Sequence, residues 1–506
     1  MDLTVTRSGL ERCRRVFSYS MPVEEAVETV VPDTLPDAER ILCATGTAVI
    51  KSKEPRAGAV GVTGAVAVSL LYSPEDGREA CALSATVPLS VELDAPGVTE
   101  ASLCAASITV SGVEARLLNP RKLLIRCVTD VSLCCWERSE LSLATGIEGE
   151  GAERIQTLTQ PVTFCPTAAV TEKSFAVTDE YQLQPGLLPL GDILWRRTEL
   201  CPGSVRSVGE RLVVNGSVRL GLIYAAEGSG ELCSANFETE YSQMIDAGRE
   251  LSSPDVAVYP MLTAEYIEPV TLAGGDRGIS AEFHIVSQCV CADTVRADCL
   301  TDCYSNSLEL ETEWSETALT ASRRRSAVTA SGTVQLAAGA TPANIIRCVA
   351  VPLRAEYADG ALRCQCAVTV LCALGGGEIV SASGRVSCEA AWEPGEGETV
   401  TGVRALCQNC TANITQGGVE ARVQCELEAS AASGTVLRQL DSVAVTGETD
   451  CHDRPSVTVI RAAEGDTLWS LAKLCGSTPA LISALNGLDP SAPLAGKILL
   501  IPRSCR

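Results

Sequence analysis

Cysteine is the residue type with the most potential for chemistry in this chain, which has 25 cysteines and two histidines among 506 residues. Cys407 and Cys410 form a CxxC pair, a spacing that many zinc sites use, and Cys299 and Cys303 form a looser pair. A structural zinc ion needs four ligands, and neither pair is accompanied by a second pair at zinc-finger spacing. We therefore predict no metal ligands and no cofactor, and keep zinc binding by a cysteine pair as the alternative.

The cysteines fit better as buried free thiols. Several of them, such as Cys81, Cys127, Cys289 and Cys366, lie within alternating apolar segments. Buried thiols behave as small hydrophobic side chains. Disulfide frameworks are typical of short secreted chains, whereas this chain is long enough to bury real cores. A reducing compartment is the better interpretation.

Residue types of common catalytic sites do not form recognisable patterns here. His284 lies in an alternating run and His452 lies in a linker, and neither belongs to a Cys/His or zinc-peptidase pattern. Gly375–Gly377 predicts a hairpin connection, because a phosphate loop would continue with Lys and Ser or Thr. A carboxylate pair stays open, since acidic residues are numerous, and a cell-wall hydrolase is the rival hypothesis. We predict a protein that is not an enzyme.

Candidate binding residues lie near the end of the chain, where the pattern predicts two helices between two short strands. Alternation over 457–459 and an apolar run over 498–501 predict the strands. Asp466 or Thr467 caps the first helix, whose apolar face has the spacing i, i+3, i+4. Gly476 ends this helix, because glycine adopts the left-handed conformation at little cost.

The second helix begins with Thr478 as its cap and Pro479 at its first position. We expect Leu481, Ile482 and Leu485 to form its buried face, and an Asn-Gly pair to end it. The start of the first helix and the end of the second then form the two sides of a groove.

This groove is the candidate binding site. Its residues are Gly465, Asp466, Thr467 and Leu468 on one side and Asn486, Gly487, Leu488 and Asp489 on the other. Capping and the helix stop account for part of this set, so a ligand contact by Asn486 stays open. Trp469 is expected to pack in the core rather than stack on a sugar.

The order strand, helix, helix, strand with these residues resembles a LysM module. The resemblance covers residues 456–503. It implies a β-α-α-β domain that binds glycans containing N-acetylglucosamine, such as peptidoglycan, at the groove described above.

Composition narrows the classes of partner. The formal net charge of −23 argues against nucleic acid, which requires a basic surface. No apolar run reaches the roughly eighteen residues of a membrane span. The first residues, Met1–Ser8, lack the basic start and apolar stretch of a secretory signal. We therefore predict a cytoplasmic protein without a signal peptide or a membrane span.

An internal repeat precedes the LysM-like module. Residues 62–72 align without a gap with residues 214–224, and a more diverged copy occurs around 362–372, with Cys372 in place of a tyrosine. Tyr72 and Tyr224 are expected to pack within their units.

Each copy has the pattern of a β-unit. Valines at 60, 62, 66 and 68 alternate with small residues, and Ser73–Gly77 forms a turn. Strands at this spacing predict sandwiches or barrels. Val23–Val30 is the best helix candidate outside the C-terminal module.

The opening Leu35–Leu42, the Gly-x-Val strand that ends in Leu-Leu-Tyr, and the segment Val113–Leu123 resemble the SPOCS family of spore-coat-associated domains in Firmicutes. SPOCS-type units followed by a LysM module are similar to the SipL-type proteins of clostridia. The resemblance implies a protein of the mother-cell cytosol that is recruited to the forespore surface. It also implies that the LysM module contacts a coat-morphogenetic ATPase.

We predict a mainly β protein of tandem antiparallel sandwich-like or barrel-like SPOCS repeats, followed by a small α+β module. The expected divisions are an N-terminal segment (1–34), repeats at 35–140, 185–300 and 341–445, and the LysM module at 456–503. Short linkers are expected around 141–184 and 301–340, and a tether at Thr446–Pro455. The predicted function is a non-enzymatic adaptor in spore coat assembly, and the alternative is a peptidoglycan-binding wall or cortex protein.

Overall fold

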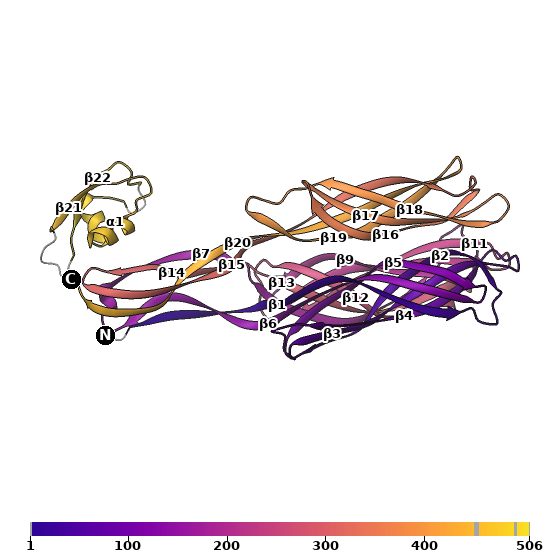
Figure 1. The fold of residues 1–506 in the computed structure, drawn as a ribbon, viewed down its shortest axis with the longest axis horizontal. Helices are drawn as coiled ribbons and strands as arrows, with labels where there is room; N and C mark the ends of the chain where they lie inside the picture. Colours follow the sequence, from indigo (N-terminus) through magenta and orange to yellow (C-terminus); the bar gives the residue numbers. More distant parts are fainter. Residues whose placement is uncertain (1–2, 450–454, 490–492, 505–506) are drawn as a thin grey trace.

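A computed structural model describes residues 3–449, 455–489 and 493–504. Figure 1 shows an elongated molecule, with three β-units at one end, a narrower stalk of paired strands, and a small C-terminal domain beyond the stalk. Within the described residues, α-helices occur only in that C-terminal domain. The predicted fold class, mainly β with a small α+β domain at the end, is confirmed.

The first β-unit contains six strands: β1 (Leu3–Val30), β2 (Ala38–Arg56), β3 (Ala59–Pro74), β4 (Cys81–Asp94), β5 (Leu103–Asn119) and β6 (Lys122–Gly149). They pair antiparallel in the orders β4-β3-β2 and β1-β6-β5. A parallel pairing of Val49 on β2 with Leu262 joins the first of these to a sheet of the second unit. The sheets approach each other where β2 lies beside β5 and where β1 lies beside β4. The unit is therefore a flattened barrel whose alternating apolar residues fill the interior.

The second unit repeats this arrangement with β8 (Thr167–Tyr181), β9 (Leu190–Val208), β10 (Arg211–Ala226), β11 (Leu232–Asp246), β12 (Asp255–Thr271) and β13 (Arg277–Ala292). The third consists of β15 (Leu308–Ala337), β16 (Asn344–Ala358), β17 (Ala361–Ala373), β18 (Ile379–Ala391), β19 (Glu398–Thr415) and β20 (Gly418–Glu448). Its strand order, β16-β17-β18-β15-β20-β19, places the six strands as in the other two units.

The stalk is made of strand ends that extend beyond the units. The outer parts of β1 and β6 pair with each other, as do those of β15 and β20, and β7 (Ile155–Phe164) pairs with β14 (Val295–Ser305). The three ribbons pack around shared apolar clusters that include Leu141, Phe164 and Leu319. A single 3-10 turn, η1 (Ala152–Arg154), joins β6 to β7 among these described residues.

Two expectations about chain segments are wrong. The regions 141–184 and 301–340 are largely strands rather than linkers, because their alternating residues are buried between ribbons that come from distant parts of the chain. Val23–Val30 is the end of β1 rather than a helix, and it pairs with β6 residue by residue. Short apolar runs fit both the helical and the strand periodicity, and here the partner strand decides between them.

The expected tether Thr446–Pro455 begins within β20, and its residues 450–454 lie outside the described residues.

Tyr72 and Tyr224 pack within their units as predicted. Each side chain is fully buried. The Tyr72 hydroxyl donates to the Pro36 carbonyl at 3.0 Å, and the Tyr224 hydroxyl donates to the Leu188 carbonyl at 2.8 Å. The same bond in both units ties the central strand to the segment that leads into the barrel.

Candidate functional site

The C-terminal head (residues 455–504) forms the predicted order of elements: β21 (Val457–Arg461), α1 (Leu468–Cys475), α2 (Pro479–Asn486) and β22 (Ile498–Pro502). Thr467 caps α1 and forms a capping box with Ser470, and left-handed Gly476 ends the helix. Thr478 caps α2, with Pro479 in its first turn. These local signals are sufficient to fix both helices in a very short segment.

The core of the head is small. Leu471, Ala472 and Ile482 from the helices meet Leu499 and Ile501 from β22. The prediction for the second helix is wrong in part, because only Ile482 of its expected apolar face is buried. Leu481 and Leu485 are 42% and 51% exposed, since two short strands offer too little surface to cover both sides of α2.

The first side of the candidate groove begins at Gly465, an exposed residue with φ of +91° and no atom within 4 Å of where a Cβ would lie. The Asp466 carboxylate accepts a hydrogen bond from the Ala463 backbone N–H at 2.7 Å and so closes the turn. Thr467 uses its hydroxyl for the cap, and Leu468 packs against the core. Open backbone on this side is therefore provided mainly by the glycine.

The second side is built around Asn486. Its side-chain amide donates to the Leu500 carbonyl at 2.7 Å and to the Ile482 carbonyl at 2.8 Å, and its oxygen accepts from the Leu500 N–H at 2.8 Å. Asn486 therefore fastens α2 to β22. Gly487 is the left-handed end of α2, and both Gly487 and Asp489 are exposed.

Both sides of the predicted groove rest on the same apolar core. Leu468 from the first side and Leu488 from the second pack against the same cluster. Gly465 and Gly487 remain exposed above them. The arrangement leaves backbone groups and small apolar surfaces for a ligand, while most polar side chains of the predicted set are engaged in turns and caps.

The head also docks on the tip of the stalk, a contact that sequence reasoning missed. Trp469 on α1 donates from Nε1 to Oδ2 of Asp302 on β14 at 2.8 Å, and Lys473 Nζ donates to Oδ1 at 2.6 Å. The Tyr304 ring meets the Trp469 ring edge to face, with centroids 4.9 Å apart. The Tyr304 hydroxyl donates to the Ser477 carbonyl at 2.9 Å. Trp469 thus packs in a core as predicted, and part of that core belongs to the stalk.

Docking changes the acidity of the stalk residues. Burial works to raise the pKa of Asp302, but the hydrogen bonds from Lys473 and Trp469 outweigh it and hold that pKa below its usual value. Burial raises the pKa of Tyr304 to about 12. Asp302 is therefore an ionised carboxylate that receives both donors at neutral pH.

The outer face of the head's sheet carries exposed apolar side chains. Strands β21 and β22 pair so that Val459 lies opposite Leu500. Val457, Val459, Ile498 and Leu500 share this face and are 48%, 62%, 71% and 45% exposed. Four large apolar side chains on one face of a two-stranded sheet form a surface suited to protein contact. We call these four residues the outer sheet face.

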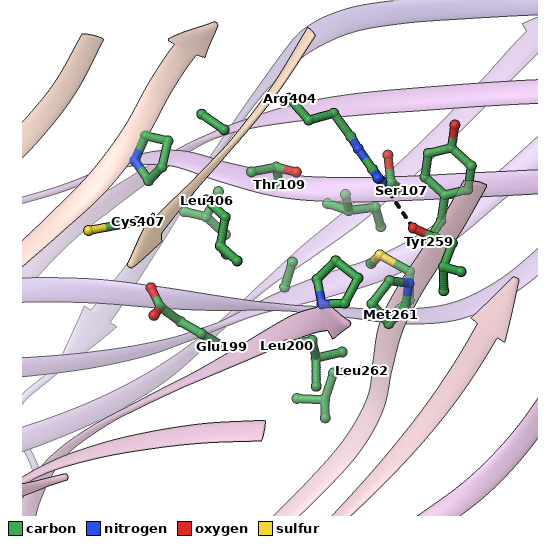
Figure 2. Close-up of a pocket in the computed structure, with 18 of the residues that line it drawn as sticks. Ser107, Thr109, Glu199, Leu200, Tyr259, Met261, Leu262, Arg404, Leu406 and Cys407 are labelled. Carbon is green, nitrogen blue, oxygen red and sulfur yellow. Dashed lines mark hydrogen bonds between the residues drawn. The ribbon is translucent and has the colours of Figure 1, made fainter. Parts of the chain in front are cut away.

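A cavity of about 570 Å³ lies where the three β-units meet. It is lined by β2 and β5, by β9 and β12, and by β16 and β19, which are the strands at the seam of each barrel. Figure 2 shows Arg404 beside Tyr259, with Met261 and Leu262 in the apolar part of the lining. Arg404 donates to the Val258 carbonyl at 3.0 Å and pairs with Glu428 at 2.9 Å. These polar groups join the second unit to the third rather than point at an open site.

Candidate catalytic and metal-binding groups are placed separately. His284 is partly exposed and bonds to Glu282, its neighbour on the same strand, at 2.7 Å. His452 lies outside the described residues. The Cys407 and Cys410 thiols have different neighbours, since Cys410 Sγ lies 2.8 Å from Cys348 Sγ and Cys407 Sγ lies 3.6 Å from the Asn409 carbonyl. A register shift between Cys407 and Asn409 sets Cys407 opposite Cys425 and Cys410 opposite Val423, and both side chains pack against the core of the third unit with different nearest neighbours.

The second cysteine pair of the sequence lies in the stalk. Cys299 and Cys303 are buried in different apolar clusters of the stalk. All cysteines within the described residues are free thiols. The described residues also contain no helix that is long and apolar enough to span a membrane.

Comparison with protein-family models gives two matches. Residues 37–118 match the SipL, SPOCS domain, and residues 461–502 match the LysM domain. The first match covers most of β2 to β5 in the first unit, and the second covers α1, α2 and β22 of the head. The chain therefore has the SPOCS plus LysM architecture, which is consistent with a sporulation-related protein built from binding domains. No curated protein and no solved structure matches the chain.

Proposed function

We propose that this protein is a non-enzymatic adaptor in spore envelope assembly, and that its head binds a partner protein. The observation that carries the proposal is the exposed outer sheet face. Glycan binding at the groove does not require four exposed apolar side chains on another face, whereas apolar surface of this kind is a usual feature of protein interfaces. The partner implied by the SPOCS and LysM resemblance is a coat-morphogenetic ATPase of the mother cell.

The position of the head supports this proposal. Contacts with Asp302 and Tyr304 hold one side of α1 against the stalk, while the outer sheet face is exposed. The head therefore presents a fixed binding surface at the end of the stalk, away from the three units (Figure 1). Further contacts by those units would raise the overall avidity through effective concentration.

A second candidate function is binding of peptidoglycan or another N-acetylglucosamine glycan. The open backbone at Gly465 and the exposed Gly487 support it, because both belong to the set of residues predicted to line the groove. This function uses the groove rather than the outer sheet face, so the two candidates can be separated by substitution.

The test uses the full chain with two surface variants. Val459→Asp combined with Leu500→Asp places charge on the outer sheet face. Leu474→Asp is the matched control, because Leu474 is a 75% exposed apolar residue of the head outside that face. Each protein is offered a lysate of sporulating cells and, separately, insoluble peptidoglycan, and captured proteins are identified by mass spectrometry.

Recovery of the coat ATPase by the wild type and by Leu474→Asp, with loss in the outer-face variant, would support the adaptor proposal. Peptidoglycan binding that is equal in all three proteins, without the ATPase, would replace it with the glycan-binding function. ATPase recovery that is equal in all three would show that the outer sheet face is not the binding surface.

A further inference from the structure

Three thiols converge inside the third β-unit. Cys364 and Cys366 lie on β17 and Cys425 lies on β20, and all three are completely buried. The Cys366 sulfur lies 3.6 Å from that of Cys364 and 3.5 Å from that of Cys425. The three sulfur atoms all lie within 4.8 Å of one another. Strands from two sides of the barrel therefore direct their thiols to one point.

This convergence is more than the strand geometry requires. Residues two apart on a strand lie on the same face with Cα atoms about 6.6 Å apart, from a rise of roughly 3.3 Å per residue. The Cys364 and Cys366 sulfurs are separated by only 3.6 Å. Their side chains therefore lean toward each other instead of standing parallel.

Cys388 supplies a fourth thiol. It lies on β18 directly opposite Cys364 in the antiparallel ladder, and its side chain is completely buried. Its thiol donates to the Val423 carbonyl at 3.8 Å and lies outside the group of three, so Cys388 completes a set of four only by turning its side chain toward the others.

The other two units serve as an internal comparison, because their barrels have the same strand arrangement. The ladder pair formed by Cys364 and Cys388 corresponds to Gly64 and Leu89 in the first unit. In the second unit it corresponds to Gly216 and Tyr241. The barrel fold therefore closes without thiols at these two positions, and Cys364 and Cys388 are particular to the third unit.

The geometry points to a structural zinc site in the third β-unit, with Cys364, Cys366, Cys388 and Cys425 as its four ligands. Four thiolates around one point are the ligand set of a closed, tetrahedral zinc site. With Zn–S bonds of about 2.3 Å, tetrahedral ligands have sulfurs about 3.8 Å apart. The observed separations of 3.6 and 3.5 Å need little adjustment to match.

Zinc at this point would join β17 and β18 to β20 across the barrel interior, so it would stabilise the third unit. The CxxC pair is not part of the proposed ligand set, because Cys407 lies opposite Cys425 in the ladder and the Cys410 thiol is hydrogen-bonded to that of Cys348. This inference rests on the thiol cluster and not on the function proposed for the head.

The test uses the full chain, purified with a reductant and without a metal-chelating tag. The number of zinc ions per chain is measured by elemental mass spectrometry. The zinc is then exchanged for cobalt(II), whose absorption spectrum reports tetrahedral thiolate ligation. The site variant combines Cys364→Gly, Cys366→Val and Cys388→Leu, which are the residues of the first unit at those positions. The matched control is Cys372→Ser, a change at another completely buried cysteine of β17.

We expect about one zinc per chain, a four-thiolate cobalt spectrum, and a drop in the thermal unfolding midpoint when a chelator is added. The control should keep all three properties, and the site variant should fold without metal and lose them. A wild type that binds no metal, or whose cobalt spectrum shows fewer thiolates, would overturn the inference. If the site variant fails to fold, the wild-type stoichiometry and spectrum decide alone.

Discussion

Removal of one carboxylate should release the head from the stalk. Asp302 receives two hydrogen bonds from α1, one from Trp469 Nε1 at 2.8 Å and one from Lys473 Nζ at 2.6 Å. We predict that Asp302→Ala shifts the docking equilibrium toward an undocked head while the head itself remains folded. The caps and the apolar core of the head do not involve Asp302.

The magnitude follows from the exposure of the groups. A hydrogen bond to a charged acceptor is worth about 1.5–3 kcal/mol, which applies to the partly buried Trp469. The side chain of Lys473 is 45% exposed, so solvent screens its ion pair to at most about 1 kcal/mol. Both donors regain water on undocking, so we expect a total loss of about 2 kcal/mol, or roughly 30-fold in the docking equilibrium.

Fluorine NMR of the full chain labelled with 5-fluorotryptophan can measure this change, because docking places the Trp469 ring against Tyr304. Trp469→Phe assigns the resonance among the five tryptophans. The matched control is Asp298→Ala, an exposed carboxylate on the same strand. Equal docked populations in Asp302→Ala and Asp298→Ala would refute the role of this contact.

Docking should also depend on pH. The folded pKa of Asp302 is lowered, so its contribution is complete above the ordinary aspartate pKa of about 3.9 and is lost as the pH falls through the lowered value. The Trp469 resonance should therefore move toward its undocked position only in acid below about pH 4. Loss of docking between neutral pH and pH 5 would contradict this assignment.

Three further outcomes are expected. Asn486→Ala should lower the unfolding free energy of the head by about 1–3 kcal/mol in chemical denaturation, because it leaves backbone groups of α2 and β22 without a partner. An unchanged denaturation midpoint would argue against the role of Asn486 in joining α2 to β22. Tyr72→Phe should cost about 1 kcal/mol through loss of its bond to a backbone carbonyl, and Tyr224→Phe should cost the same, whereas a large difference between them would contradict their equivalence. Burial raises the pKa of Tyr224 and of Tyr304 to about 12, so these tyrosines ionise first in the unfolded chain as the pH rises. Their contribution to the unfolding free energy should be complete below about pH 10 and should fall as the pH rises toward 12. Unfolding followed by circular dichroism across this pH range tests whether stability falls.

Local signals in the sequence were sufficient for the head. A threonine cap, a proline in the first turn and glycine stops act within a few residues, so they determine the helices without reference to the rest of the chain. The repeat at 62–72 and 214–224 likewise predicts the central strand of each unit, and β3 and β10 occupy the same place in their units.

Other features depend on partners that are distant in the sequence. The whole third unit lies between Asp302 and Trp469 in the sequence, and no local pattern near either residue predicts their contact. The strands within 141–184 and 301–340 are not evident from the sequence, because they pair with distant parts of the chain, as β7 does with β14 and β15 with β20. Leu481 and Leu485 have the spacing of a buried face, yet the head is too small to cover them.

The cysteines show most clearly which features the sequence determines and which depend on the tertiary structure. Composition and alternation determined that thiols would line the strand interiors, because a strand places every second residue on one face. The sequence also offered Cys407 and Cys410 as the nearest pair, but a ligand set is defined by positions in space. Only the closure of the barrel brings β17 and β20 together, and with them the three thiols of Cys364, Cys366 and Cys425, with Cys388 on the neighbouring β18.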